Sequence, residues 1–314
     1  MNAIRSLAFA CLLPTPWSAQ AQTVLLKPSE FGLRIEIDGR LFSEYRTTDA
    51  QRPYLYPLTG PSGANLARPY PMEAGGAKDH PHHRSMWFTH GGVNGVDFWG
   101  DGKLNGTIKH TAFEQLKTVG AVGSFVAKSS WETPGGKVVM TDERLLRIEA
   151  LAGGGTMVDW TLKLIASAGD VTFTDTKEGS FALRLCPSLS MTESKAAHIT
   201  TSTGVADRAA WGTRAKWVTY HGPDPQGNVV SVTIFDHPQN LRHPTWWHAR
   251  DYGLVAANPF GIHDFERSTD KTKGNYQLAQ GQSLTLRYRV LIESGNPVQA
   301  KLAERFVEFG KVGQ

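Results

Sequence analysis

Four of the eleven histidines of this 314-residue chain fall within eleven residues, at positions 80, 82, 83 and 90. Imidazole gives and takes protons near neutral pH and is also a common metal ligand. The same string contains an acid, a basic residue and a tryptophan, namely Asp79, Arg84 and Trp87. Such a combination is unusual for a merely solvated loop. The string therefore predicts acid–base chemistry, with His82 or His83 as the base and Asp79 orienting it.

Charged residues elsewhere in the chain could complete such a site. Lys177, Arg250 or Arg84 could stabilise negative charge that develops during a reaction, and Glu178 or Asp251 could act as the partner acid. A glycosidase with two carboxylates would need those groups at a set separation, which the sequence does not give.

Two aromatic and polar segments are typical of sugar recognition. In the segment 241–261, tryptophans are flanked by arginine, aspartate and histidine, so an indole could stack on a sugar ring while charged groups bind its hydroxyls. Trp246 and Trp247 are adjacent, so we expect one of them to face the core. The second segment is the glycine-rich 91–100. It lacks the phosphate-loop pattern, so nucleotide binding is excluded as its function. The predicted substrate-binding residues are Asn94, Trp99, Trp247, His248, Arg250, Asp251, Tyr252 and Asn258.

Two other functions fit the same residues. A divalent metal could be held by His80, His82 and an outlying His90 or His248, although the spacing matches no standard zinc motif. A non-catalytic sugar-binding module would use the tryptophans and arginines, but it would have no need of four clustered histidines.

Short strands must position these residues. Apolar residues alternate with polar ones at 33–37, 158–164 and 284–292, and 229–235 is a β-branched run. Gly- and Pro-rich turns separate these runs without intervening helices, which indicates antiparallel sheets packed face to face. One helix is expected near the C-terminus, where Val298, Leu302 and Phe306 share a face. With no repeat or long linker, we expect one all-β sandwich domain over residues 22–314.

The N-terminus has the pattern of a secretory signal peptide. Arg5 precedes an apolar core at 7–13, and Ala19-Gln20-Ala21 predicts cleavage after Ala21, so residues 1–21 would be removed and the protein would be periplasmic or secreted. No other stretch is long and apolar enough to span a membrane. The net charge of +4, without basic blocks, argues against nucleic acid as a partner. The sequence does not indicate an oligomeric state.

Four stretches together resemble the PmoA-like family of exported proteins: residues 52–58, 79–99, 175–184 and 243–261. The strings His-Pro-His-His-Arg, Arg-Asp-Tyr-Gly and Asn-Pro-Phe-Gly are the most specific parts of this resemblance. It implies a β-sandwich similar to the galactose-mutarotase supersandwich and a role beside sugar-degrading enzymes. The family's label refers to a membrane-bound methane oxygenase, and a mature chain without a membrane span does not suit that reaction.

These observations lead to one prediction about the site. We expect the strings 80–84 and 247–252 to line a single pocket, because each is too polar and too aromatic for a buried strand face. That pocket would act on a sugar or glycoside, as a lyase, epimerase or hydrolase, by histidine-dependent proton transfer with or without a divalent metal.

Overall fold

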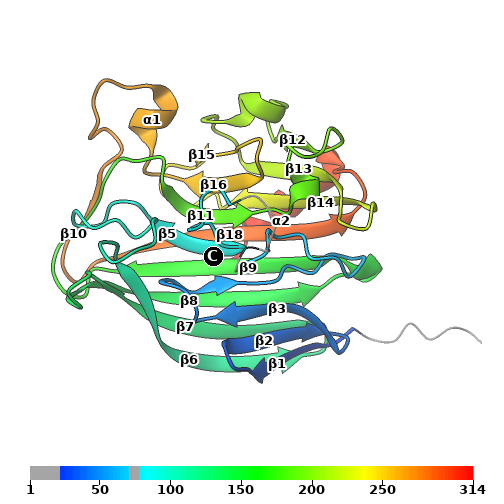
Figure 1. Cartoon of the computed structure of the whole chain (residues 1–314), viewed down its shortest axis with the longest axis horizontal. Helices are drawn as coiled ribbons and strands as arrows, with labels where there is room; N and C mark the ends of the chain where they lie inside the picture. Colours follow the sequence, from blue (N-terminus) through cyan, green and yellow to red (C-terminus); the bar gives the residue numbers. More distant parts are fainter. Residues whose placement is uncertain (1–21, 71, 73–77, 314) are drawn as a thin grey trace, which may run out of the picture.

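The computed structural model describes residues 22–70, 72 and 78–313, which form antiparallel β-sheets (Figure 1). The first sheet has eight strands in the order β1-β2-β3-β4-β5-β11-β16-β15. Its strands are β1 (Val24–Pro28), β2 (Gly32–Ile37), β3 (Arg40–Arg46), β4 (Tyr54–Leu55), β5 (Met86–His90), β11 (Gly179–Arg184), β15 (Trp246–Trp247) and β16 (Leu254–Asn258).

The second sheet also has eight strands, in the order β12-β13-β14-β18-β9-β8-β7-β6. They are β6 (Thr107–Val119), β7 (Val122–Glu132), β8 (Val138–Ala150), β9 (Thr156–Ile165), β12 (His198–Thr201), β13 (Trp217–Pro223), β14 (Val229–Asp236) and β18 (Ser283–Ser294). A separate small pair joins β10 (Val171–Phe173) to β17 (Tyr276–Leu278). The α-helices of the described residues are α1 (Ile262–Glu266) and α2 (Gln299–Phe309).

Aromatic side chains join the two large sheets. Phe181 of β11 meets Trp160 of β9 edge-on, with 5.5 Å between ring centroids, and stacks on Tyr288 of β18 at 4.6 Å. Tyr45 of β3 contacts Phe125 of β7 edge-on, with 5.5 Å between ring centroids. Burying such large apolar surfaces is the main force that holds two sheets face to face. The predicted antiparallel β-sandwich is confirmed.

The strands predicted from alternation are present as β2, β9, β14 and β18. The predicted C-terminal helix is α2, and its Leu302 and Phe306 are buried against Trp217 and Phe235 of the second sheet. Helix α1 was not predicted, because five residues are too few to show a helical period. The predicted signal peptide, residues 1–21, lies outside the described residues. Within the part of the chain that is described, no helix is long and apolar enough to cross a membrane.

The first sheet presents different residues on its two faces. On β11, Phe181 and Leu183 belong to the core between the sheets, whereas Ala182 lies in a smaller cluster with Trp87 of β5 and Ala256 of β16. This alternation follows from the two-residue repeat of a strand. Because β5, β11 and β16 are neighbours (Figure 1), their second set of side chains forms one continuous surface, which we call the outer face.

Candidate functional site

A pocket of about 370 Å³ lies at the outer face, where loops from both sides of β5 meet the ends of β11 and β15. We call it the histidine pocket. The predicted meeting of the strings 80–84 and 247–252 is confirmed, because each string contributes three residues. The lining residues are His80, His82, His83, Asp97, Trp99, Gly100, Lys177, Glu178, His248, Arg250 and Tyr252.

His83 is held as a neutral hydrogen-bond donor. Its Nδ1 lies 3.2 Å from Nη1 of Arg184, and because a guanidinium only donates, Nδ1 must accept and the ring proton must sit on Nε2. The side chain is buried between Trp87, at 5.7 Å between ring centroids, and Trp99, at 5.6 Å. Burial, together with the neighbouring His82 and Arg184, lowers the pKa of His83 far below its usual range. This imidazole therefore stays uncharged at physiological pH.

His82 is placed differently, with its ring partly open to the pocket. Its ring contacts His80 and His83, but no described side chain or backbone group hydrogen-bonds its nitrogens. Burial and the charge of Arg52 lower the pKa of His82 to about 4. At neutral pH the imidazole is therefore unprotonated and able to accept a proton from a bound molecule.

His248 and the Lys177–Glu178 pair lie at the wall formed by β11 and β15. Nδ1 of His248 donates to the backbone oxygen of Lys177 at 3.0 Å, which leaves Nε2 as an acceptor. Burial lowers the pKa of His248 to about 4. Nζ of Lys177 lies 2.7 Å from a carboxylate oxygen of Glu178, so a cation and a carboxylate share the same wall. The pocket thus combines one fixed donor, two neutral acceptors and an ion pair.

Aromatic rings form part of the wall of the histidine pocket. The ring of Tyr252 stacks on that of His80, with 5.1 Å between centroids and 14° between planes. Trp99 is almost fully buried under His82 and His83 and is hydrogen-bonded through its backbone nitrogen to Asp97. Both were predicted as substrate-binding residues, and both line the pocket.

Asp79 does not orient His82 or His83, in contrast to the prediction. Its carboxylate accepts hydrogen bonds from Nδ1 of His80 at 2.7 Å and from Nη2 of Arg184 at 2.9 Å. Although burial opposes it, these bonds lower the pKa of Asp79. Asp79 reaches His83 indirectly, because Arg184 bonds the ring of His83 and Arg68 bonds its backbone oxygen while both arginines bond the Asp79 carboxylate.

Arg84 was predicted to stabilise charge in the pocket, and this is wrong. Its side chain is 1% exposed, donates to the backbone oxygen of Pro81, pairs with Asp101 and lies over the ring of Tyr70 at 3.6 Å. Arg52 pairs with the same aspartate and donates to the backbone oxygen of His82. Both arginines therefore hold the histidine string from below instead of facing a ligand.

Four predicted substrate-binding residues have structural roles. Trp247 is fully buried in the core and donates to the backbone oxygen of Ala215, and Trp246 is also buried, so both tryptophans are internal. Asn258 is fully buried and closes the turn before α1 through the backbone nitrogens of Phe260 and Gly261.

The other two lie at loop surfaces. Asn94 bonds the backbone of Asp170 and Thr172 next to β10. Asp251, which was also predicted as a partner acid, pairs with the exposed Arg208 at 2.8 Å. Neither residue lines the histidine pocket, because alternation and turns direct them away from it.

The metal set of His80, His82 and His90 is not found. His90 is fully buried at the end of β5, where Nε2 donates to the backbone oxygen of Thr174 at 2.7 Å and the ring packs on Phe260. In residues 22–70, 72 and 78–313, no three His, Cys, Asp or Glu side chains are arranged to hold a metal ion. Strand β5 lies between His82 and His90 and ends at His90. His90 is therefore outside the pocket that His80 and His82 line.

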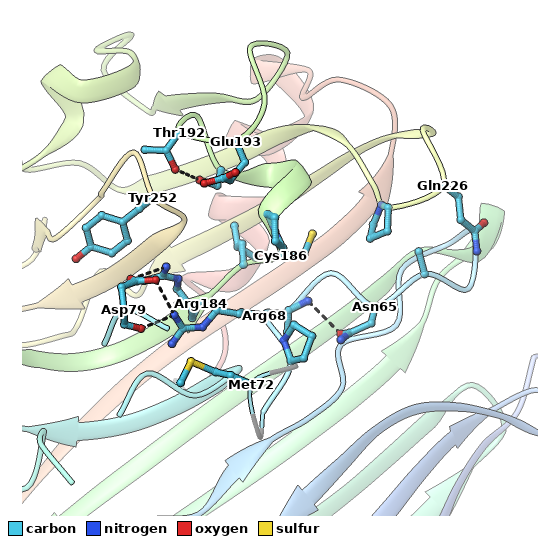
Figure 2. A pocket seen from close by; sticks show the side chains of 17 residues that line it. Asn65, Arg68, Met72, Asp79, Arg184, Cys186, Thr192, Glu193, Gln226 and Tyr252 are labelled. Carbon is cyan, nitrogen blue, oxygen red and sulfur yellow. Dashed lines mark hydrogen bonds and ion pairs between the residues drawn. The ribbon is translucent and has the colours of Figure 1, made fainter. Parts of the chain in front are cut away.

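A larger cavity of about 670 Å³ adjoins the histidine pocket and was not predicted (Figure 2). Arg68, Asp79, Arg184 and Tyr252 lie along it, and Tyr252 lines both cavities. We call it the arginine cavity. One signal in the sequence could have found it: Arg184 is a charged residue inside the apolar run 181–186, and a buried charge needs a partner or a role.

Comparisons with known proteins give a family but no activity. Residues 32–307 match a family of unknown function, DUF6807. The chain belongs to this DUF6807 family. A comparison with curated proteins gives no match. One solved structure that it resembles, from the human microbiome, is provisionally named a kojibiose phosphorylase; the identity is 11% and the TM-score 0.35. The match covers 87% of this chain and 32% of the other, so this member of DUF6807 spans about a third of that protein.

Proposed function

We propose that this DUF6807 protein is a carbohydrate-active enzyme that works on a sugar or glycoside by histidine-dependent proton transfer. One observation carries the proposal. His82 is uncharged at neutral pH and its ring nitrogens have no hydrogen-bond partner among the described residues, yet it lines a pocket with an ion pair and stacked aromatic rings. A neutral base open to a ligand is what general base catalysis needs.

The surrounding residues divide the remaining work. His82 accepts the proton from a substrate hydroxyl or carbon, and Nε2–H of His83 donates a fixed hydrogen bond to the oxygen on which negative charge develops. Lys177 and Arg250 add positive charge on the same side, the Glu178 carboxylate holds Lys177 in place, and protonated His82 returns its proton to the leaving or rearranged group. The ring of Tyr252 supports the apolar face of the sugar. Whether the outcome is elimination, epimerisation or hydrolysis depends on which substrate bond lies next to His82.

The binding-module alternative is weaker on this geometry. It needs exposed aromatic platforms, but Trp247 is fully buried. The metal alternative is weaker too, because His80, His82 and His248 line the pocket but do not form a set of three ligands that could hold a metal ion in the described part of the chain. The proton-transfer proposal assigns roles only to side chains that line the histidine pocket.

Substitution of His82 tests the proposal directly. A screen of oxidised and unoxidised disaccharides identifies the substrate, and His82→Ala should then lower turnover by about 10²–10⁴-fold, the usual contribution of a general base. His198→Ala is the matched control, because His198 is half exposed on β12, outside the pocket, and should leave turnover unchanged. Circular dichroism would check that both variants keep their strands.

Other results of the same experiments would contradict the proposed function. If folded His82→Ala keeps more than half of the wild-type turnover, His82 is not the base. If no glycan is bound or altered, with or without added divalent ions, the sugar reading fails. Loss of activity on chelation, restored by one ion, would favour the metal alternative.

We also propose that the protein is exported, on the pattern of residues 1–21. N-terminal sequencing of the protein recovered from the periplasm or medium should begin at Gln22. A mature cytoplasmic protein that retains Met1 would contradict the proposal.

A further inference from the structure

The arginine cavity has more positive than negative charge at its inner end. Arg68 and Arg184 are 6% and 4% exposed, and both donate to the single carboxylate of Asp79 (Figure 2). Burial and the neighbouring charge of Arg184 lower the pKa of Arg68 to about 10. Two buried like charges with one counter-ion are costly, and a second anion beside them would relieve that cost.

The donors of Arg184 are not used up by the protein. Its two Nη groups carry four N–H bonds and use one on Asp79 and one on Nδ1 of His83, which leaves two for a ligand, whereas its unpartnered Nε is buried. The flat guanidinium also lies 4.6 Å from the ring centre of Tyr252. A planar cation with free donors beside an aromatic ring suits a carboxylate attached to a sugar ring.

The position of the cavity links it to the proposed reaction. Tyr252 separates and lines both cavities, and Arg184 reaches from the arginine cavity to His83 of the histidine pocket. Volumes of about 670 and 370 Å³ are in the range of ligand sites, which usually measure ~300–1,000 Å³. Two linked sugar units could occupy the two cavities on either side of Tyr252.

We propose that the arginine cavity binds an acidic sugar unit through its carboxylate at Arg184, with Arg68, whose own donors are held by Asp79, His80 and His83, adding positive charge beside it. The histidine pocket holds the neighbouring part of the same substrate. This inference rests on the proposed function for its role in catalysis, but the binding itself can be measured without turnover.

The cavity also contains a group that opposes an anion. Glu193 lines its outer part, is exposed, and in Figure 2 lies near Thr192, apart from the two arginines. An anionic ligand must therefore sit at the inner end. This makes Glu193 a useful test position, because removing its charge should help an acidic ligand and leave a neutral one unaffected.

Calorimetry with methyl glycosides provides the test. We expect a methyl glucuronide or galacturonide to bind His82→Ala protein at least about tenfold more tightly than its neutral parent glycoside, and added salt should weaken only the acidic ligand. The use of His82→Ala keeps the ligand intact and makes the result independent of the proposed catalytic base.

Variants then locate the binding. Arg68→Gln should reduce the preference for the acidic glycoside, because it removes one of the two positive charges beside the ligand carboxylate. Because Arg68 also donates to the backbone oxygens of His80 and His83, a second variant is needed. Glu193→Lys should tighten the acidic glycoside by about twofold to threefold. Glu304→Lys, on the exposed side of α2, is the matched control and should change nothing.

Three outcomes would overturn the inference. These are equal affinity for acidic and neutral glycosides, no binding of either, or a Glu193→Lys effect equal to that of Glu304→Lys. A stronger preference for a sugar phosphate or sulfate than for a uronide would overturn the carboxylate assignment. If the acidic preference holds but no turnover is found, the proposed function fails and the binding site stands.

Discussion

Buried charge is arranged differently in the two large sheets. In the second sheet each of the two buried arginines has its own aspartate: Arg144 pairs with Asp142, and Arg289 pairs with Asp159 at 2.6 Å. At the outer face of the first sheet, two pairs of arginines each share a single aspartate. Arg52 and Arg84 share Asp101, and Arg68 and Arg184 share Asp79.

This difference separates charges that serve the fold from charges that serve a ligand. A matched pair is electrically neutral without a further ion, so it can be sealed between strands. A surplus of positive charge next to cavities is relieved only by water or by an anion. This surplus beside the histidine pocket is our reason for placing the proposed site on this face.

The largest expected effect lies in the second sheet. Asp142→Ala would leave Arg144 uncompensated at 0% exposure and remove the acceptor of Nε1 of Trp131. Breaking such a buried pair from one side typically costs about 3–5 kcal/mol. Urea denaturation should show a loss of this size in the free energy of unfolding.

The matched control replaces both partners. Asp142→Leu with Arg144→Leu removes the pair together and should recover most of the loss. A loss below about 1 kcal/mol for Asp142→Ala would break the comparison, because the matched pair would then not be needed for stability.

The next effect concerns pH and the buried histidines. His90 and His248 have pKa values of about 4 in the folded protein, mainly because of burial, and about 6.5 when unfolded. Between these values the unfolded chain binds more protons, so stability falls as the pH falls from 6.5 toward 4. Each histidine should cost about 2 kcal/mol between pH 6.5 and pH 5.

Denaturation at the two pH values checks this. His248→Gln should lose less stability on acidification than the wild type, by that amount, and His198→Gln, with its half-exposed ring, should behave as the wild type. Equal acid sensitivity in His248→Gln and the wild type would show that His248 is already charged in the folded protein.

The sequence predicted the sandwich well but only part of the site. Period-two alternation locates β9 and β18 because burial on one face is local information along a strand. The His80–His83 string and Lys177–Glu178 reach the pocket because they lie at strand ends, where loops are free to turn toward a ligand. Trp247 and Asn258 were misassigned for the opposite reason, since residue type does not tell which face of a short strand is inside.

The arginines show the other limit of sequence reasoning. Arg52, Arg68 and Arg184 are isolated in the chain and lie up to 132 positions apart, as their numbers 52 and 184 show, so no motif joins them. Arg68 and Arg184 meet at Asp79 because Ala67 pairs with Leu185 at the end of β11, whereas Arg52 reaches the backbone of His82 because β4 and β5 are neighbours. The shared use of Asp79 and Asp101 is a property of this topology, and it becomes visible only when the strand order is known.

The smallest expected effect concerns a third kind of charge, at the surface. Asp251 pairs with Arg208, whose side chain is 74% exposed, and such pairs contribute about 0–1 kcal/mol because water and salt screen them. Asp251→Asn should therefore change the free energy of unfolding by less than about 0.5 kcal/mol and leave turnover unchanged, although the sequence made it a candidate acid. Glu178→Gln, which changes a carboxylate that does line the histidine pocket, is the comparison and should lower turnover. If Asp251→Asn lowered turnover as much as Glu178→Gln does, Asp251 would take part in the reaction and could not be classed as a surface charge outside the pocket.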